Sequence, residues 1–310
     1  MKIAIIGQQD FGKAVLEVFL ARGDEVAAVF CAPEKESARP DVLRLAAQEK
    51  GLKVHQFKSL KDPGAAGAMQ SAGADLGIMA FVLQFVSQEF ATIPRHGTIQ
   101  YHPSLLPKYR GPSSINWPII KGETETGLTI FRPSDGLDEG AVILQKKTPI
   151  GPDDTLGTIY FNRLFPMGVE AMLEAADLVL SGKYKETEQI EAHASYEGWC
   201  RSAEAKIDWT KPIDQVYNLI RGCNPAPGAW TTFNGKKLQI FDARKTLFRR
   251  FADVPGKIGE VTGVTAQTFK VTAQGGTIEI VRAKFEDGKK VSGGEAALAG
   301  SFGTGTLLGS

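Results

Sequence analysis

The sequence predicts an α/β fold in which a doubly wound, mostly parallel sheet is followed by a smaller C-terminal β-barrel of the OB-like kind. Short apolar runs alternate with helical periodicity up to about residue 180, which is typical of βα units. After residue 206, short strand-like runs are separated by Asn-Gly, Gly-Gly and Asp-Gly turns. The length of 310 residues exceeds the usual size of one domain, so two domains are expected.

The first part of the chain alternates expected strands and helices. The run at residues 2–6 is apolar and β-branched and ends at Gly7, which is typical of a buried parallel strand. The other expected strands are residues 25–31, 52–57, 74–81, 97–102 and 125–131. The expected helices are residues 11–22, 40–50 and 153–180.

The first domain is expected to cover residues 1–205, of which about 183–205 form a polar linker, and the second domain to cover 206–310. The second domain begins with an expected helix at residues 212–221. Its expected strands are residues 229–233, 238–243, 256–264, 269–273 and 277–283. Short, evenly spaced strands of this kind suggest a small β-barrel. The Gly-rich tail, residues 300–310, is expected to be ordered only in part.

The composition is that of an ordinary soluble globular protein, with 43% hydrophobic and 23% charged residues. Cys31, Cys200 and Cys223 lie far apart in the sequence and form no C-x-x-C pair, which argues against a disulfide framework and against a zinc site. The N-terminal apolar run is too short for a signal peptide, and no segment approaches the length of a membrane span. We therefore expect a cytoplasmic protein without a bound metal.

Basic residues are concentrated in the C-terminal part, although the net charge is only +1. From Lys206 onward 15 Lys and Arg accompany 9 Asp and Glu, whereas the first 205 residues hold 21 and 26. The segment ARKTLFRRF, residues 243–251, contributes most visibly. It is explained either by a solvated face or by contact with a polyanion, such as an RNA backbone or a polyglutamate tail.

The first βα turn, GQQDFG at residues 7–12, matches nucleotide-binding motifs only loosely. It lacks the G-x-G-x-x-G pattern, and no Lys-Ser/Thr pair follows its second glycine. The second expected strand ends in Cys31 rather than in an acidic residue that would hold a ribose. We expect a tight strand-to-helix turn and no NAD(P) site.

The segment QYHPSLLPKYRG, residues 100–111, carries the first candidate site. His102 follows the end of an expected strand, where ligands bind in open α/β sheets. Gln100 lies two residues earlier, on the same face of the strand. Ser104 is flanked by Pro and Leu and lacks the G-x-S-x-G context of a nucleophile, so we predict a loop-capping hydroxyl.

The segment SDGLDEGAVILQ, residues 134–145, carries the second candidate site. Asp135 and Asp138 lie in a Gly-flanked turn before an apolar strand. Aspartates are common turn formers, which is one explanation. The other is chemical, because a carboxylate beside the carboxyl end of a sheet can orient a histidine and take up a proton.

Together, HPSLLPKYRG and GLDEG resemble the folate-dependent formyltransferase family. The resemblance extends over nearly the whole chain. The segments MKIAIIGQQDFG, IQYHPSLLP, SSINWPIIKG, DDTLGTIYFNRLFP and KIDWTKP…IRGCNPAPGAW are most similar to the N-terminal hydrolase domain of 10-formyltetrahydrofolate dehydrogenases. The C-terminal part also resembles methionyl-tRNA formyltransferases. The resemblance implies a formyltransferase catalytic domain followed by a formyltransferase C-terminal domain.

By this resemblance, the catalytic residues are His102, Asp138 and Gln100, and the formyl donor is 10-formyltetrahydrofolate. Gln100 stands where the family usually has Asn, so its amide donor lies one methylene further out. The implied folate-binding residues are Phe81, Leu83, Gln84, Phe85, Val86, Ser134, Asp135, Gly136 and Leu137. The implied loop-supporting residues are Ser104, Leu105, Pro107, Arg110 and Gly111.

The acceptor of the formyl group separates the functional hypotheses. The favoured one is a hydrolase-like enzyme that uses water or a small acceptor, and the alternatives are methionyl-tRNA, a sugar amine, or a folate-binding module without catalysis. Such a module has no need of both His102 and Asp138. The loop at residues 32–44 has three basic and three acidic residues, whereas methionyl-tRNA formyltransferases usually carry a longer, more basic loop there. Neither DNA nor a membrane is expected as a partner.

Overall fold

The computed structural model describes residues 1–35 and 39–309, which form two compact units. The first unit comprises Met1–Ser114, Gly127–Thr148 and Arg163–Glu197. The second comprises Ile115–Thr126, Pro149–Asn162 and the chain from Gly198 onward. Each unit combines segments that are far apart in the sequence, and each is described by itself. The expected boundary after residue 205 stays a prediction.

The first unit is built on a seven-stranded sheet with the order β3-β2-β1-β4-β5-β6-β7. The strands are β1 (Lys2–Gly7), β2 (Glu25–Cys31), β3 (Val54–Gln56), β4 (Leu76–Ala80), β5 (Thr98–His102), β6 (Glu125–Phe131) and β7 (Val142–Pro149). The first five strands run parallel, and β6 runs antiparallel to β5. The predicted mostly parallel sheet is confirmed.

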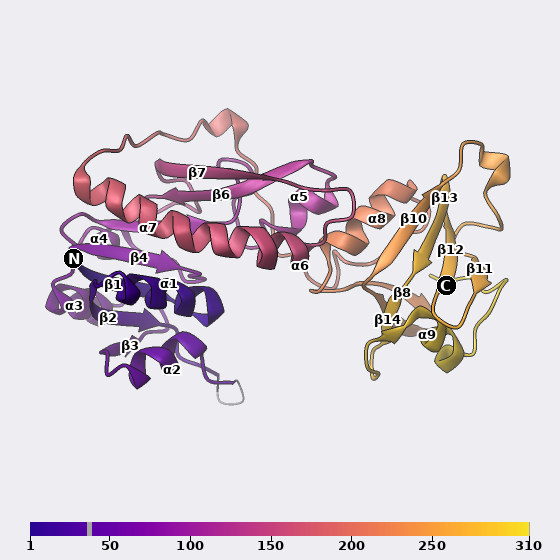
Figure 1. The fold of residues 1–310 in the computed structure, drawn as a ribbon, viewed down its shortest axis with the longest axis horizontal. Helices are drawn as coiled ribbons and strands as arrows, with labels where there is room; N and C mark the ends of the chain where they lie inside the picture. Colours follow the sequence, from indigo (N-terminus) through magenta and orange to yellow (C-terminus); the bar gives the residue numbers. More distant parts are fainter. Residues whose placement is uncertain (36–38, 310) are drawn as a thin grey trace. The chain divides into compact units, whose positions relative to one another are not determined.

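Helices cover both faces of this sheet, as Figure 1 shows. One face carries α1 (Gln9–Ala21), α2 (Val42–Glu49) and α7 (Phe165–Ser181), and the other carries α3 (Pro63–Ala72) and α4 (Gln88–Ala91). Because side chains alternate along a strand, Ile3 and Ile5 of β1 lie in the first core and Ala4 and Ile6 in the second. The sheet is therefore doubly wound, as the sequence predicted.

The region at residues 153–180, expected to be a long amphipathic helical region, is helical but interrupted. A short helix α6 (Leu156–Ile159) begins at Thr155, whose hydroxyl accepts from the backbone N–H of Thr158. A π-helical turn (Tyr160–Leu164) separates α6 from α7. Pro166 lies in the first turn of α7 and has no N–H to bond the preceding turn. A widened turn at that point accommodates the missing bond.

The second unit contains two four-stranded sheets, ordered β10-β13-β12-β11 and β15-β14-β9-β8. Its strands are β8 (Ala229–Phe233), β9 (Lys236–Ile240), β10 (Ala243–Leu247), β11 (Val261–Val264), β12 (Phe269–Ala273), β13 (Gly276–Ile280), β14 (Arg282–Phe285) and β15 (Val291–Ser292). Its helices include α5 (Asn116–Ile120), α8 (Ile213–Gly222) and α9 (Gly293–Gly300). The antiparallel character of this region is confirmed.

Two expected strands are each split between the two sheets. The run 238–243 divides into the end of β9 and the start of β10, and the run 277–283 divides into β13 and β14. At both breaks the chain crosses from one sheet to the other, and Val281 donates its backbone N–H to the carbonyl of Asp242 between them. The sequence pattern could not show these crossings, because apolar alternation continues through them.

The C-terminal tail is more ordered than the sequence suggested. Residues 293–300 form α9, and Leu307 forms a β-bridge with Glu260. Gly309 donates its backbone N–H to the carbonyl of Thr232. The expectation of partial order is therefore wrong for residues 300–309, because backbone hydrogen bonds tie this glycine-rich stretch to the second unit.

All three cysteines are buried, and none of them forms a disulfide within the described residues. Cys200 and Cys223, distant in the sequence, have their sulfur atoms 3.8 Å apart. Burial raises the pKa of the Cys31 thiol to about 12, so this thiol stays protonated at neutral pH. Within residues 1–35 and 39–309, no cluster of three or more His, Cys, Asp or Glu side chains could hold a metal ion. No helix in the same residues is long and apolar enough to cross a membrane.

Candidate active site

His102 is the last residue of β5, and it is only 5% exposed. Its Nε2 atom lies 2.8 Å from the carbonyl oxygen of Tyr109. Because a carbonyl can only accept a hydrogen bond, Nε2 carries a proton. The other ring nitrogen, Nδ1, is then the atom at which the ring can gain or lose a proton.

Asp138 faces this second nitrogen of the ring. Its Oδ2 atom lies 3.5 Å from Nδ1 of His102 and accepts a hydrogen bond of 2.9 Å from the backbone N–H of Gly111. The Asp138 backbone has φ of 55°, a left-handed conformation that aspartate tolerates better than most residues. The structure thus brings together the histidine and aspartate that the sequence paired.

The loop between His102 and Gly111 is fixed by contacts to the sheet. Ser104 is fully buried, and its hydroxyl donates to the carbonyl of Lys108 at 2.7 Å. Thr129 of β6 donates from its hydroxyl to the Ser104 carbonyl and accepts from the backbone N–H of Leu106. Ser104 is therefore placed as a loop-capping hydroxyl. Leu105 lies against β6, and Pro107 accepts from the backbone N–H of Ser195.

Gln100 lies on the same face of β5 as His102, opposite Met79 of β4 and Phe131 of β6. The residue is half-buried. Among the residues that the structure describes, its side-chain amide has no hydrogen-bond partner. Its N–H groups are therefore available to a bound molecule.

The two segments expected to hold folate are brought side by side. Gln88 lies two residues after Val86, the last expected folate-binding residue of the first segment. Its backbone N–H donates to Oδ1 of Asp135 at 3.1 Å. The Ser134 hydroxyl is buried and has no hydrogen-bond partner in the described part of the chain. Buried hydroxyls are normally paired, so this one is suited to a ligand that supplies the partner.

The expected folate-binding residues differ in their exposure. Apolar surface is presented by Leu83, by Phe85 at 61% exposure, and by Leu137. Val86 is instead buried in the core beside α3 and α4, and the amide of Gln84 donates to the carbonyl of Phe57 at 2.6 Å. Phe81 has φ of 61°, so the chain turns sharply where β4 ends. Gly136 lies in the loop of the second expected folate-binding segment, next to the side chain of Glu139.

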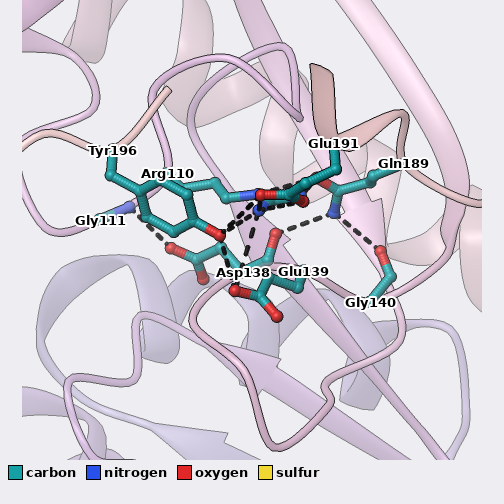
Figure 2. A network of polar contacts seen from close by, with 8 residues as sticks. All are labelled: Arg110, Gly111, Asp138, Glu139, Gly140, Gln189, Glu191 and Tyr196. Atoms are coloured by element: carbon teal, nitrogen blue, oxygen red, sulfur yellow. Dashed lines mark hydrogen bonds and ion pairs between the residues drawn. The ribbon is translucent and has the colours of Figure 1, made fainter. Parts of the chain in front are cut away.

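The structure adds residues that the sequence did not single out. Arg110, expected only as loop support, is 1% exposed and is surrounded by Glu139, Gln189, Glu191 and Tyr196 (Figure 2). Three of these partners lie in the stretch expected to be a linker. That stretch has no apolar periodicity, so the sequence carried no signal for its contact with the His102 loop.

A separate hollow of about 290 Å³ lies at the amino ends of β1 to β3. It is lined mainly by polar groups, among them Lys2, Glu25, Lys53 and His55. His102 and Asp138 are not among its lining residues. Because ligands of open α/β sheets bind at the carboxyl ends of the strands, we place the candidate site at His102.

Comparison with known proteins defines the class to which this fold and site belong. Residues 1–176 match the formyl transferase family, and residues 200–299 match the formyl transferase C-terminal domain. The chain therefore belongs to the formyl transferase family, and its class is that of formyl-transferring enzymes.

Individual relatives differ in the activity that their names describe. The mitochondrial 10-formyltetrahydrofolate dehydrogenase of Mus musculus is 36% identical over 317 residues, which cover 97% of this chain. The chain spans only about a third of the length of that dehydrogenase, 33%. The methionyl-tRNA formyltransferase of Syntrophus aciditrophicus (strain SB) is 33% identical over 314 residues and is covered to 99%. The match to it spans 100% of this chain.

The solved structure of HypX from Aquifex aeolicus, in complex with tetrahydrofolic acid, has a similar fold. The TM-score is 0.69 with 21% sequence identity, over 96% of this chain and 47% of HypX. At this level of identity the likeness supports the fold.

Proposed function

We propose that this protein removes the formyl group from 10-formyltetrahydrofolate by general acid–base catalysis and passes it to water or to a small acceptor. The observation that carries the proposal is the pair of the buried His102 and the half-buried Asp138 at the carboxyl end of β5, with 3.5 Å between Nδ1 and Oδ2. The hydrolase-like form of the reaction yields tetrahydrofolate and formate.

The first step is attack on the formyl carbon, which converts the carbonyl oxygen into an oxyanion. The Nε2–H group of His102 is held by the Tyr109 carbonyl, so the ring presents Nδ1 to the reacting group. When Nδ1 is protonated, it donates a hydrogen bond or its proton to the oxyanion. The unpaired amide of Gln100 supplies a second donor from the same strand face.

Asp138 accepts the proton that the attacking nucleophile loses. As water attacks, the Asp138 carboxylate takes one of its protons, directly or through a second water molecule, while the backbone N–H of Gly111 holds the carboxylate in place. Collapse of the intermediate breaks the bond between the formyl carbon and N10, and N10 receives a proton from Asp138. No covalent enzyme intermediate is required, so Ser104 has no role as a nucleophile.

Folate binding is supported by the two adjoining loops. The unpartnered Ser134 hydroxyl offers a polar contact, and Phe85 and Leu137 offer exposed apolar surface suited to a flat pterin. The tetrahydrofolic acid bound to HypX agrees with this assignment. The proposal needs neither a metal nor NAD(P) in this chain, and it places the reaction in cytoplasmic one-carbon metabolism.

The choice of water or a small acceptor is supported by the loop after β2. Its Arg44 guanidinium is already paired with Glu34 through Nε and with Gln48 through Nη1 at 2.7 Å. Two of the five N–H donors of this guanidinium are thereby held within the chain. Residues 36–38 of this loop lie outside the described residues.

Methionyl-tRNA formylation is the second candidate, and a specific feature favours it. The edge strand β10 carries Arg244 and Lys245, which pair with Glu279 and Asp214, and it ends at the exposed Leu247, followed by the exposed Phe251. Basic side chains beside an exposed aromatic ring suit a nucleic-acid backbone, whose affinity depends on salt. The methionyl-tRNA formyltransferase of Syntrophus aciditrophicus is matched over 99% of its own length. A sugar amine remains the third acceptor class, and a folate-binding module without catalysis is the non-enzymatic alternative.

The deciding experiment measures tetrahydrofolate release from 10-formyltetrahydrofolate, with and without charged methionyl-tRNA. We expect release without tRNA, reduced by at least about 10²-fold in His102→Ala and Asp138→Ala, because each variant removes a group that acts in the transition state. Release that occurs only with tRNA would support tRNA binding by the basic β10 surface and would overturn the hydrolase-like proposal. Binding of folate without release under either condition would favour the non-catalytic alternative.

A further inference from the structure

Arg110 is an unusual residue because it is the largest fully buried side chain in the described part of the chain. Burying a guanidinium is unfavourable unless its donors are paired. Here Nε and Nη2 both donate to Oε1 of Gln189, at 3.1 and 3.0 Å. Nη1 donates to the carboxylate of Glu191 and to the hydroxyl of Tyr196. The partners come from one segment, residues 187–197, which we call the strap.

The strap is also joined to the His102 loop through its backbone. The backbone N–H of Arg110 donates to the Ser195 carbonyl at 2.9 Å, and that of Glu197 donates to the Arg110 carbonyl at 3.0 Å. The Ser195 hydroxyl accepts from the backbone N–H of Tyr109 at 2.8 Å. Tyr109, whose carbonyl accepts from His102, is thereby held from both sides.

Gln189 connects this arrangement to the other catalytic loop (Figure 2). While its Oε1 atom accepts from Arg110, its Nε2 atom donates to the backbone carbonyls of Asp138 and Gly140, both at 2.8 Å. These bonds hold the backbone at and just after Asp138, whose left-handed conformation an unsupported chain would leave readily.

Tyr196 provides a second link to the same loop. Its hydroxyl donates to Oε1 of Glu139 at 2.6 Å and accepts from Arg110, whose guanidinium carbon lies 5.0 Å from the centre of its ring. The hydrogen bond to Glu139 raises the pKa of the Tyr196 phenol, so the phenol remains a donor. The residue next to Asp138 is thus fixed as well.

We propose that the strap sets the position of the Asp138 carboxylate relative to His102. Gln189 and Tyr196, both anchored by Arg110, are the positioning residues, and they act on the Asp138 backbone and on Glu139. This inference rests on the proposed function, in which Asp138 is the proton acceptor. Neither residue needs to touch the folate. Displacement of a catalytic group by about 1 Å can lower a rate on the order of 10²-fold, so loss of either link should be visible in catalysis.

The chain contains a matched control for Tyr196. Tyr184 makes the same kind of contact, since its hydroxyl accepts from Arg132 at 2.7 Å and lies 3.3 Å from Oε1 of Glu186. Arg132 also lies over the Tyr184 ring, at 5.6 Å. In the described part of the chain, neither of these two contacts of the Tyr184 hydroxyl involves Asp138. Tyr184→Phe therefore removes an equivalent hydroxyl without touching the strap's link to the site.

The test compares Tyr196→Phe, Gln189→Met and Tyr184→Phe with the unaltered full chain, using two readouts. The first is kcat and KM for 10-formyltetrahydrofolate. The second is the NMR chemical shifts of the His102 ring nitrogens at one fixed pH, which need no activity and are tractable because the chain has only four histidines. We expect Tyr196→Phe and Gln189→Met to lower kcat by roughly 10- to 100-fold with KM within about twofold. We expect both variants to change the chemical shift of His102 Nδ1, because the Asp138 carboxylate that faces this atom moves.

Each outcome bears on the inference in a definite way. If Tyr184→Phe changes kcat and the His102 chemical shift as much as Tyr196→Phe does, the strap has no special role. If the chemical shift is unchanged in both strap variants, the positioning inference is overturned whatever the activity. An unaltered protein without turnover, combined with a changed His102 chemical shift in the strap variants only, would refute the proposed function and leave the positioning of Asp138 supported.

Discussion

At the scale of single residues, Gln100 carries the amide that we propose as the second hydrogen-bond donor to the oxyanion. Its amide is half-buried, on the same face of β5 as His102, and without a partner in the described residues. The resemblance of the sequence to the family implies Asn at this position, which would present its donor one methylene closer to the strand. In that comparison the position of the donor, more than its chemical type, sets this chain apart.

We expect Gln100→Leu to lower kcat by about 10²- to 10³-fold, because it removes an oxyanion donor. Gln100→Asn keeps the donor but retracts it, so we expect a smaller decrease and an unchanged KM. The measurement is steady-state release of tetrahydrofolate. A Gln100→Asn rate equal to that of the unaltered chain, with His102→Ala and Asp138→Ala inactive, would show that Gln100 does not contact the oxyanion.

At the scale of elements, the turn at Gly111 must satisfy two demands at once. Its φ is 101°, and a Cβ atom there would lie 2.4 Å from the carbonyl oxygen of Glu197. Its backbone N–H must also reach Asp138. Any side chain at this position therefore pushes the strap away from the loop that holds the carboxylate.

We expect Gly111→Ala to lower the free energy of unfolding by roughly 1–3 kcal/mol through backbone strain, with a further loss from the clash. The measurement is denaturant unfolding together with kcat. Gly23→Ala is the control, because Gly23 has φ of 92° and no atom lies within 4 Å of the position that its new methyl group would take. If both variants lose stability equally and both keep full activity, the contact with Glu197 has no consequence for the site.

The sequence predicted elements well where periodicity is strong. The expected bounds of β2, β6, β8 and β12 agree with the structure, because each is a short apolar run between clear turn residues. His102 and Asp138 could be paired because both lie in distinctive loops. The strap could not be predicted, since its contacts run through polar side chains such as Gln189 that leave no periodic pattern. Pro166, by contrast, is visible in the sequence and accounts for the interruption of the helical region.

At the scale of the whole molecule, charged contacts at the edge of the sheet make stability depend on pH. The Glu34 carboxylate accepts from the backbone N–H of Asp41 at 3.0 Å, from Arg44, and from the Gln56 amide at 2.9 Å. These bonds, that to Asp41 foremost, lower the pKa of Glu34 from 4.5 to about 2. The carboxylate thus joins α2 to β3.

A lowered carboxylate pKa stabilises the folded chain above the unfolded value of 4.5, and this contribution is lost as the pH falls toward about 2. We therefore expect Glu34→Gln to be less stable than the unaltered chain at pH 7, with the difference shrinking between about pH 4.5 and pH 2. Denaturant unfolding of both proteins across this range is the measurement. A difference that stays constant with pH would show that the Glu34 charge does not contribute.

The strap also has a consequence for the order in which the protein is made. His102 and Asp138 leave the ribosome well before Gln189 and Tyr196, which reach Arg110 only after α7 has been synthesised. At translation speeds of about 5–20 residues per second, the interval between Asp138 and Tyr196 lasts several seconds. During that time the growing chain holds the proposed catalytic side chains without the segment that we infer to align them, so activity would begin as a late event in the biogenesis of the molecule.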